Sequence, residues 1–140
     1  MAECGCGGTT KIIYACSGAA DVGEISDRVA RTLRNNGFGN MTCLAAIGAH
    51  LSGFIESAKA ADENITIDGC PVACARKNLE HIGVTPKSYI LTEMGLVKGK
   101  TEVSDEIIEV VCSKISSGDV KIKTDKCGTD GCGCGSGGCK

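Results

Sequence analysis

Eleven cysteines are the residues best able to do chemistry in this chain of 140 residues, which has only 2 histidines. Thiols ligate zinc and iron–sulfur clusters, form disulfides and act as nucleophiles. An odd number cannot pair completely within one chain, and the start, Met1–Cys4, has neither the basic residues nor the apolar run of an export signal. Because cytoplasmic thiols are kept reduced, we expect a cytoplasmic protein that uses its cysteines for metal binding or thiol chemistry.

The composition argues against several other classes of protein. The chain has 15 Lys and Arg residues against 17 Asp and Glu residues, a net charge of −2, which does not favour binding to nucleic acid. With 2 Tyr, 2 Phe and no Trp, a surface that stacks on bases is not expected either. No apolar run reaches the roughly 18 residues that a membrane helix needs, so we expect no membrane insertion.

The cysteines have two kinds of surroundings, since six lie in glycine-rich ends and five lie between those ends. We therefore divide the chain into an N-terminal arm (residues 1–10), an α/β domain (residues 11–117) and a C-terminal tail (residues 118–140). The two ends lack hydrophobic periodicity, so we expect them to be flexible. The cysteines of the tail could form a second tetrahedral metal site, although their spacing matches no common zinc finger. They are Cys127, Cys132, Cys134 and Cys139.

Between the two ends, strand patterns alternate with helix patterns. Short apolar or β-branched runs predict strands over residues 11–16, 41–46, 64–68 and 87–92. Apolar spacings of three and four predict helices over residues 21–36, 51–61, 71–81 and 104–116. This alternation predicts a small doubly wound α/β domain: a mainly parallel four-stranded sheet in the order 2-1-3-4, with helices on both faces.

The predicted strands deliver four cysteines to one edge of that sheet. Cys16 ends the first strand, Cys43 lies near the end of the second, and Cys70 directly follows the third. Cys74 lies one helical turn after Cys70, and the start of a helix stabilises negative charge on sulfur. Because function in such folds is found at the carboxyl ends of the strands, we expect these four sulfurs to converge there.

The motifs around these cysteines resemble those of the DGC family of predicted zinc-binding proteins. The resemblance rests on CSGAA at residues 16–20 and IDGCP at residues 67–71, with Cys43 between them and Cys74 after them, and it spans about residues 11–115. It implies an α/β domain with a four-cysteine metal site. By residue match, the implied ligands are Cys16, Cys43, Cys70 and Cys74. Small or acidic neighbours would surround these ligands or bind an anion: Ser17, Gly18, Asp68 and Gly69.

Two functions of different classes follow from these residues. In the first, the four thiolates hold zinc, or alternatively an iron–sulfur cluster, for metal carriage or sensing, with a metal-receiving or redox protein as partner. In the second, the chain is a thiol-dependent redox or sulfur-transfer enzyme. Cys70 would then attack and Cys74 resolve, or Cys16 would carry a persulfide or bind an oxyanion. We expect the first function, without catalytic residues.

Three further residues are given structural roles. Cys112 lies among apolar residues of the last predicted helix, so we expect it in the hydrophobic core. His50 and His81 are expected at the surface or at helix ends.

Overall fold

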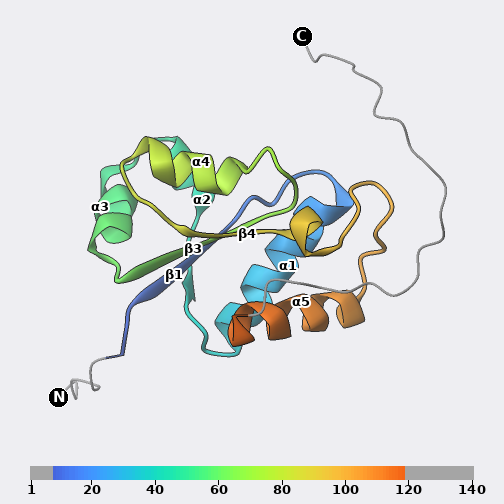
Figure 1. The fold of residues 1–140 in the computed structure, drawn as a ribbon. Coiled ribbons are helices and arrows are strands. Elements are labelled where there is room, and N and C mark those ends of the chain that lie inside the picture. Colours follow the sequence, from blue (N-terminus) through green and yellow to red (C-terminus); the bar gives the residue numbers. More distant parts are fainter. Residues whose placement is uncertain (1–7, 119–140) are drawn as a thin grey trace, which may run out of the picture.

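A four-stranded parallel sheet lies at the centre of this computed structural model, which describes residues 8–118 of the chain (Figure 1). Its strands are β1 (Lys11–Ala15), β2 (Asn40–Met41), β3 (Glu63–Asp68) and β4 (Lys87–Ile90). Each neighbouring pair is parallel, and the order β2-β1-β3-β4 confirms the predicted fold class and strand order. After β1, the chain adds β2 on one side of β1 and later adds β3 and β4 on the other side. The direction in which strands are added therefore reverses between β1 and β3.

Helices cover both faces of the sheet (Figure 1). One face carries α1 (Asp21–Asn35) and α5 (Asp105–Ser117), and the other carries α2 (Leu44–Gly48), α3 (Ser52–Ala60) and α4 (Cys74–His81). The second metal site expected at Cys127, Cys132, Cys134 and Cys139, and most of both expected ends, lie outside the described residues.

Alternation along β1 divides the buried residues into two hydrophobic clusters. Ile13 and Ala15 belong to the cluster beneath α1 and α5, whereas Ile12 and Tyr14 belong to the cluster beneath α2, α3 and α4. Side chains of a strand point alternately to opposite faces, and Cys16 continues the alternation by packing against the second cluster. The thiol that follows β1 therefore lies on the side of the sheet that carries α4.

The apolar stripe predicted for the first helix is confirmed, because α1 buries Val22, Ile25, Val29 and Leu33. Cys112 of α5 is 6% exposed and belongs to the same cluster, as expected. Burial, assisted by the charge of Glu109, raises the pKa of the Cys112 thiol to about 11. Cys112 is thus a neutral packing residue at physiological pH.

The second predicted strand, over residues 41–46, is wrong for most of its length. β2 ends at Met41, and Leu44–Gly48 form the helix α2. A short and mostly apolar run has no period that distinguishes a strand from a buried helix, and its leucine and alanines favour the helix. Cys43 therefore lies in the turn directly before α2 and not within a strand.

Two other predicted elements differ in their boundaries. The helix predicted over residues 71–81 begins only at Cys74, because Ala73 has a left-handed backbone with a φ of 54°. The strand predicted over residues 87–92 is shorter, since its last residues join the 3-10 helix η1 (Leu91–Met94). Cys74 is thus the first residue of α4.

Candidate functional site

Cys16 lies at the carboxyl edge of the sheet, between β1 and β3. Its backbone N–H donates to the carbonyl oxygen of Ile67 (3.1 Å), which continues the pairing of the two strands by one residue. The backbone N–H of Gly69 donates to Cys16 Sγ (3.3 Å), and Ser26 Oγ lies 3.2 Å from the same sulfur. This half-buried thiol therefore lies where the strand order reverses, the usual position of a ligand site in open α/β sheets.

Ser26 fixes the loop that carries Cys16. Its buried hydroxyl donates to the carbonyl oxygen of Gly23 (2.6 Å) and accepts from the backbone N–H of Ser17 (3.3 Å). The Ser17 hydroxyl in turn donates to Asp27 Oδ1 (3.0 Å), and Ser17 has a left-handed backbone with a φ of 48°. These bonds hold the residue after Cys16 in a conformation that costs energy for a non-glycine residue.

Glycines allow the β3–α4 loop to lie directly on the start of α1. A Cβ atom added to Gly69 would lie 2.7 Å from the carbonyl carbon of Val22, and one added to Gly23 would overlap the backbone of Gly18. Gly18 and Gly69 were expected near the ligands. The structure gives Gly69 a role in close backbone packing, which brings the Cys70 loop onto the start of α1, whereas a Cβ added to Gly18 would make only an ordinary contact at 3.9 Å.

Asp68 fixes the start of α4. Its carboxylate is 1% exposed and accepts from the backbone N–H groups of Ala75 (2.8 Å) and Arg76 (3.1 Å). Burial raises its pKa, against the opposing effect of these two hydrogen bonds. Ala73, the residue before α4, has no side chain that can cap the helix. Asp68, which lies seven residues before Ala75 in the sequence, caps the helix instead and sets the position at which Cys74 begins it.

Cys70 has a cationic neighbour that sequence reasoning missed. Lys98 Nζ lies 3.9 Å from Cys70 Sγ, although the two residues are 28 positions apart. The loop of Lys98 is fastened to α1 by Asp21, which accepts from the backbone N–H groups of Gly99 (2.8 Å) and Thr101 (3.0 Å). The bond from Gly99 is the main reason that the pKa of Asp21 is lowered. No sequence pattern signals such a contact, since it depends on how this loop folds over α1.

Cys43 and Cys74 are exposed, whereas Cys16 and Cys70 are half-buried. None of these four thiols, nor Cys112, forms a disulfide. Within residues 8–118, no three His, Cys, Asp or Glu side chains already form a group that could hold a metal ion. The structure thus places all four predicted ligands at the carboxyl edge, and a complete ligand set remains a prediction.

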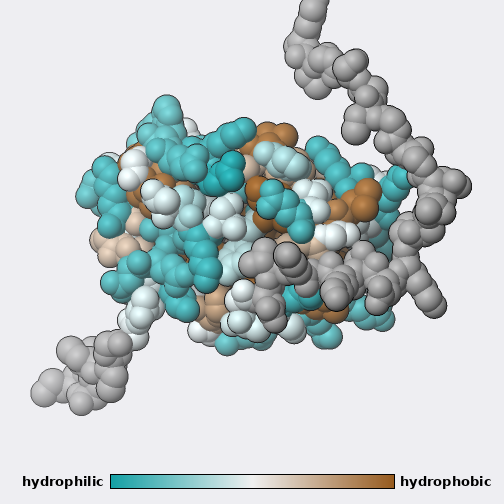
Figure 2. All heavy atoms as spheres, in the orientation of Figure 1, coloured by the Kyte–Doolittle hydropathy of each residue, from teal (hydrophilic) through white to brown (hydrophobic). Residues whose placement is uncertain are grey.

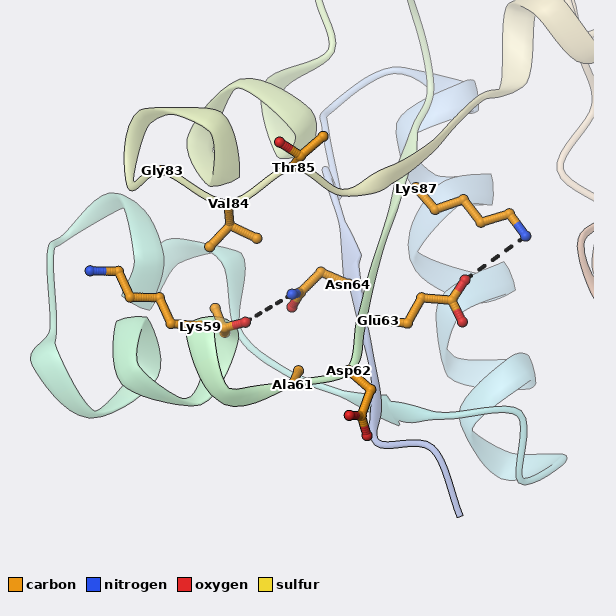
Figure 3. A pocket seen from close by; sticks show the side chains of 10 residues that line it. Lys59, Ala61, Asp62, Glu63, Asn64, Gly83, Val84, Thr85 and Lys87 are labelled. Carbon is orange, nitrogen blue, oxygen red and sulfur yellow. Dashed lines mark hydrogen bonds and ion pairs between the residues drawn. The ribbon is translucent and has the colours of Figure 1, made fainter. Parts of the chain in front are cut away.

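Other parts of the described structure offer less chemistry. A hollow of about 420 Å³ lies at the opposite, amino edge of the sheet and contains Lys59, Asp62, Glu63 and Lys87, with no thiol (Figure 3). His50 and His81 are exposed, as expected, and their rings meet edge to face with centroids 5.5 Å apart.

The exterior is mainly hydrophilic on the face shown in Figure 2. None of the helices in the described part of the chain has the length and apolar character needed to cross a membrane.

The chain is similar to a known domain family and to a curated bacterial protein. The sequence profile of the DGC domain matches residues 12–115. The "Anaerobic and virulence modulator AnvM" of Pseudomonas aeruginosa strain PAO1 is 30% identical over 88 residues, which cover 62% of this chain and 67% of AnvM. No solved structure matches the chain.

Proposed function

This chain belongs to the DGC domain family, and we propose that it binds zinc through Cys16, Cys43, Cys70 and Cys74. The observation that carries the proposal is the hydrogen bond from Gly69 N–H to Cys16 Sγ (3.3 Å). It joins the ends of β1 and β3, so that Cys16 lies beside the loop that contains Cys70 and leads into Cys74.

The chemistry of these donors fits zinc. Four unpaired cysteines at one edge match the all-sulfur ligand set of closed zinc sites. The two half-buried thiols are held by their surroundings, and the two exposed thiols have room to rotate toward a metal. Zinc bound by four thiolates has no open position for substrate, which suits metal carriage or sensing rather than hydrolysis.

Charge at the site is also consistent with thiolate ligands. Four thiolates around Zn²⁺ carry a net charge of about −2, which neighbouring donors must offset. The Gly69 N–H contacts Cys16, and the Lys98 ammonium lies close to Cys70. Both groups therefore lie where they would offset part of the charge of a metal bound by these sulfurs.

Elemental analysis of the full chain, purified without oxygen, tests this function. We expect Cys70→Ser to lower the zinc content by about one metal per chain relative to the unmodified protein, since one of four ligands is lost. Cys112→Ser is the matched control, because this buried thiol packs in the core and should leave the zinc content unchanged. Equal zinc content in both variants would contradict the proposal. Visible absorption from bound iron, lost in Cys70→Ser, would assign an iron–sulfur cluster to the same residues.

A further inference from the structure

A second ligand site is suggested by a hollow of about 580 Å³ between α1 and the turn that joins β2 to α2. Its volume lies in the range of small-molecule sites. Two thiols line it, Cys16 from the end of β1 and Cys43 from the turn before α2. Arg31 and Arg34 of α1 also line it, together with Asn78 of α4.

The hollow has an excess of positive charge. Asp27, Arg31 and Arg34 lie on one face of α1, since they are spaced by four and three residues. Arg31 Nε donates to Asp27 Oδ2 (2.7 Å), so these two charges offset each other. Among the described residues, no carboxylate pairs with Arg34, which contacts only the side-chain oxygen of Asn35 at 3.4 Å. One guanidinium fork is thus left to bind an oxyanion.

Cys16 is the thiol best prepared for reaction in this hollow. The Gly69 N–H already points at its sulfur (3.3 Å), and Ser26 Oγ lies 3.2 Å away. The Gly69 N–H holds the sulfur in a fixed position, whereas the one proton of the Ser26 hydroxyl is donated to the carbonyl oxygen of Gly23 (2.6 Å). A thiol and an unpaired arginine that line the same hollow fit a small anion that has a reactive sulfur atom.

We propose that this hollow binds a small anionic sulfane-sulfur compound, of which thiosulfate is the simplest, and that Cys16 accepts the outer sulfur. The Cys16 thiolate attacks that sulfur and forms a new S–S bond. The S–S bond of thiosulfate breaks, and its electron pair leaves with sulfite. The products are a Cys16 persulfide and sulfite, so no separate oxidant or reductant is needed. Arg34 binds the sulfonate oxygens, and it would bind the carboxylate of a cysteine persulfide in the same way.

This sulfur transfer does not rest on zinc binding, although Cys16 takes part in both. The experiment therefore uses the reduced full chain after removal of metal by a chelator. One arm supplies thiosulfate and measures released sulfite, and the other supplies cysteine persulfide. Peptide mapping by mass spectrometry after alkylation locates the persulfide in each arm. The zinc content of every variant is measured separately, so that failure of one proposal leaves the other standing.

We expect the persulfide on Cys16, and we expect Cys16→Ser to remove the sulfite released by that site. Arg34→Gln should raise the thiosulfate concentration for half-maximal rate about tenfold or more, because a charge-assisted hydrogen bond is lost, and should leave zinc content unchanged. Arg28→Gln is the matched control, since Arg28 lies on the same helix, is paired with Glu24 (2.8 Å) and does not line the hollow.

Three results would overturn the proposal. The first is a persulfide found only on cysteines other than Cys16. The second is an equal loss of rate in Arg34→Gln and Arg28→Gln, which would indicate a general effect of charge. The third is the absence of transfer from both donors. Transfer from cysteine persulfide alone, if it depends on Arg34, would support the site and identify a carboxylated donor as its ligand.

Discussion

The two edges of the parallel sheet each have a hollow, but they differ in chemistry. At the amino edge, partly exposed charges pair with one another: Glu63 lies 3.9 Å from Lys87 (Figure 3) and 3.7 Å from Lys11. At the carboxyl edge, buried polar side chains such as Ser26 and Asp68 hold loops that carry unpaired thiols. Buried polar groups are costly unless they are hydrogen-bonded. The amino edge also has one, Asn64, which is bonded to Tyr14 and Ala58, so the two edges differ in the thiols that the carboxyl edge positions.

This difference shows that the size of a hollow does not identify a site. The hollows measure about 420 Å³ at the amino edge and about 580 Å³ at the carboxyl edge. Only the second of these two hollows is lined by thiols, and the close packing of Gly69 and its N–H donor lie at the same edge of the sheet. Such positioning by surrounding hydrogen bonds is what a binding or reactive group needs. If the two edges differ in this way, substitutions at the carboxyl edge should change the free energy of unfolding more than substitutions at the amino edge.

The largest effect is expected from Gly69→Ala. The added Cβ would lie 2.7 Å from the Val22 backbone, so the β3–α4 loop must move. We expect a loss of about 1–3 kcal/mol in the free energy of unfolding, measured in urea, together with weaker zinc binding. Gly53→Ala is the matched control, because its added Cβ would have no neighbour within 4 Å apart from adjacent residues and the backbone of its own helix. It should be neutral or stabilise α3 by up to about 1 kcal/mol. Equal stability of the two variants would contradict the close packing described for the carboxyl edge.

Asp68→Ala should have the next largest effect. It removes the acceptor of the Ala75 and Arg76 N–H groups and leaves the start of α4 uncapped. We expect a loss of about 0.5–2 kcal/mol in unfolding free energy at neutral pH, with reduced helix content near 74–81 by hydrogen exchange. Full protection of these amides in the variant would show that Asp68 does not position α4.

The pH dependence of stability should distinguish Asp68 from Asp21. Burial raises the pKa of Asp68, so the part of its contribution to stability that depends on protonation is fully present below the unfolded value of about 3.9 and is lost as pH rises through the folded pKa. Its hydrogen bonds from Ala75 and Arg76 remain at neutral pH. Asp21 has a lowered pKa, so its contribution is present above about 3.9 and is lost as pH falls through the folded value. Unfolding curves of Asp68→Asn and Asp21→Asn should therefore differ from the unmodified protein with opposite pH trends. Trends of the same sign would refute this assignment.

The smallest effect is expected at the amino edge, from Glu63→Gln. Glu63 pairs with Lys11 and Lys87 near the surface, where solvent weakens ion pairs. The unfolding free energy should change by less than about 1 kcal/mol, and the change should shrink further in high salt. A loss larger than that of Gly69→Ala would reverse the comparison between the two edges.

Much of the fold could be predicted from the sequence, because its signals are local. The stripe of Val22, Ile25, Val29 and Leu33 in α1 and the core position of Cys112 follow from helical spacing. The strand order was also predicted correctly. The second strand was predicted wrongly over most of residues 41–46. This short apolar run fits a strand or a helix equally well, and in the structure most of it belongs to the turn after β2 and to α2.

The position of the candidate cysteines at the carboxyl edge could be predicted, but the contacts around them could not. The motifs indicated Cys16, Cys70 and their neighbours, yet the role of Asp68 as a cap depends on the left-handed Ala73. The approach of Lys98 to Cys70 depends on a loop tied to α1. Long-range contacts of this kind follow from packing of the whole chain, and no periodicity encodes them.

Zinc X-ray absorption provides the most direct test of the central claim, that the domain cysteines bind zinc. The sample is the full chain with its six terminal cysteines changed to serine, purified without oxygen and loaded with zinc. The changed residues are Cys4, Cys6, Cys127, Cys132, Cys134 and Cys139. The account predicts one zinc per chain with four sulfur neighbours at about 2.3 Å. A zinc surrounded mainly by nitrogen or oxygen, or a protein that retains no zinc, would contradict it.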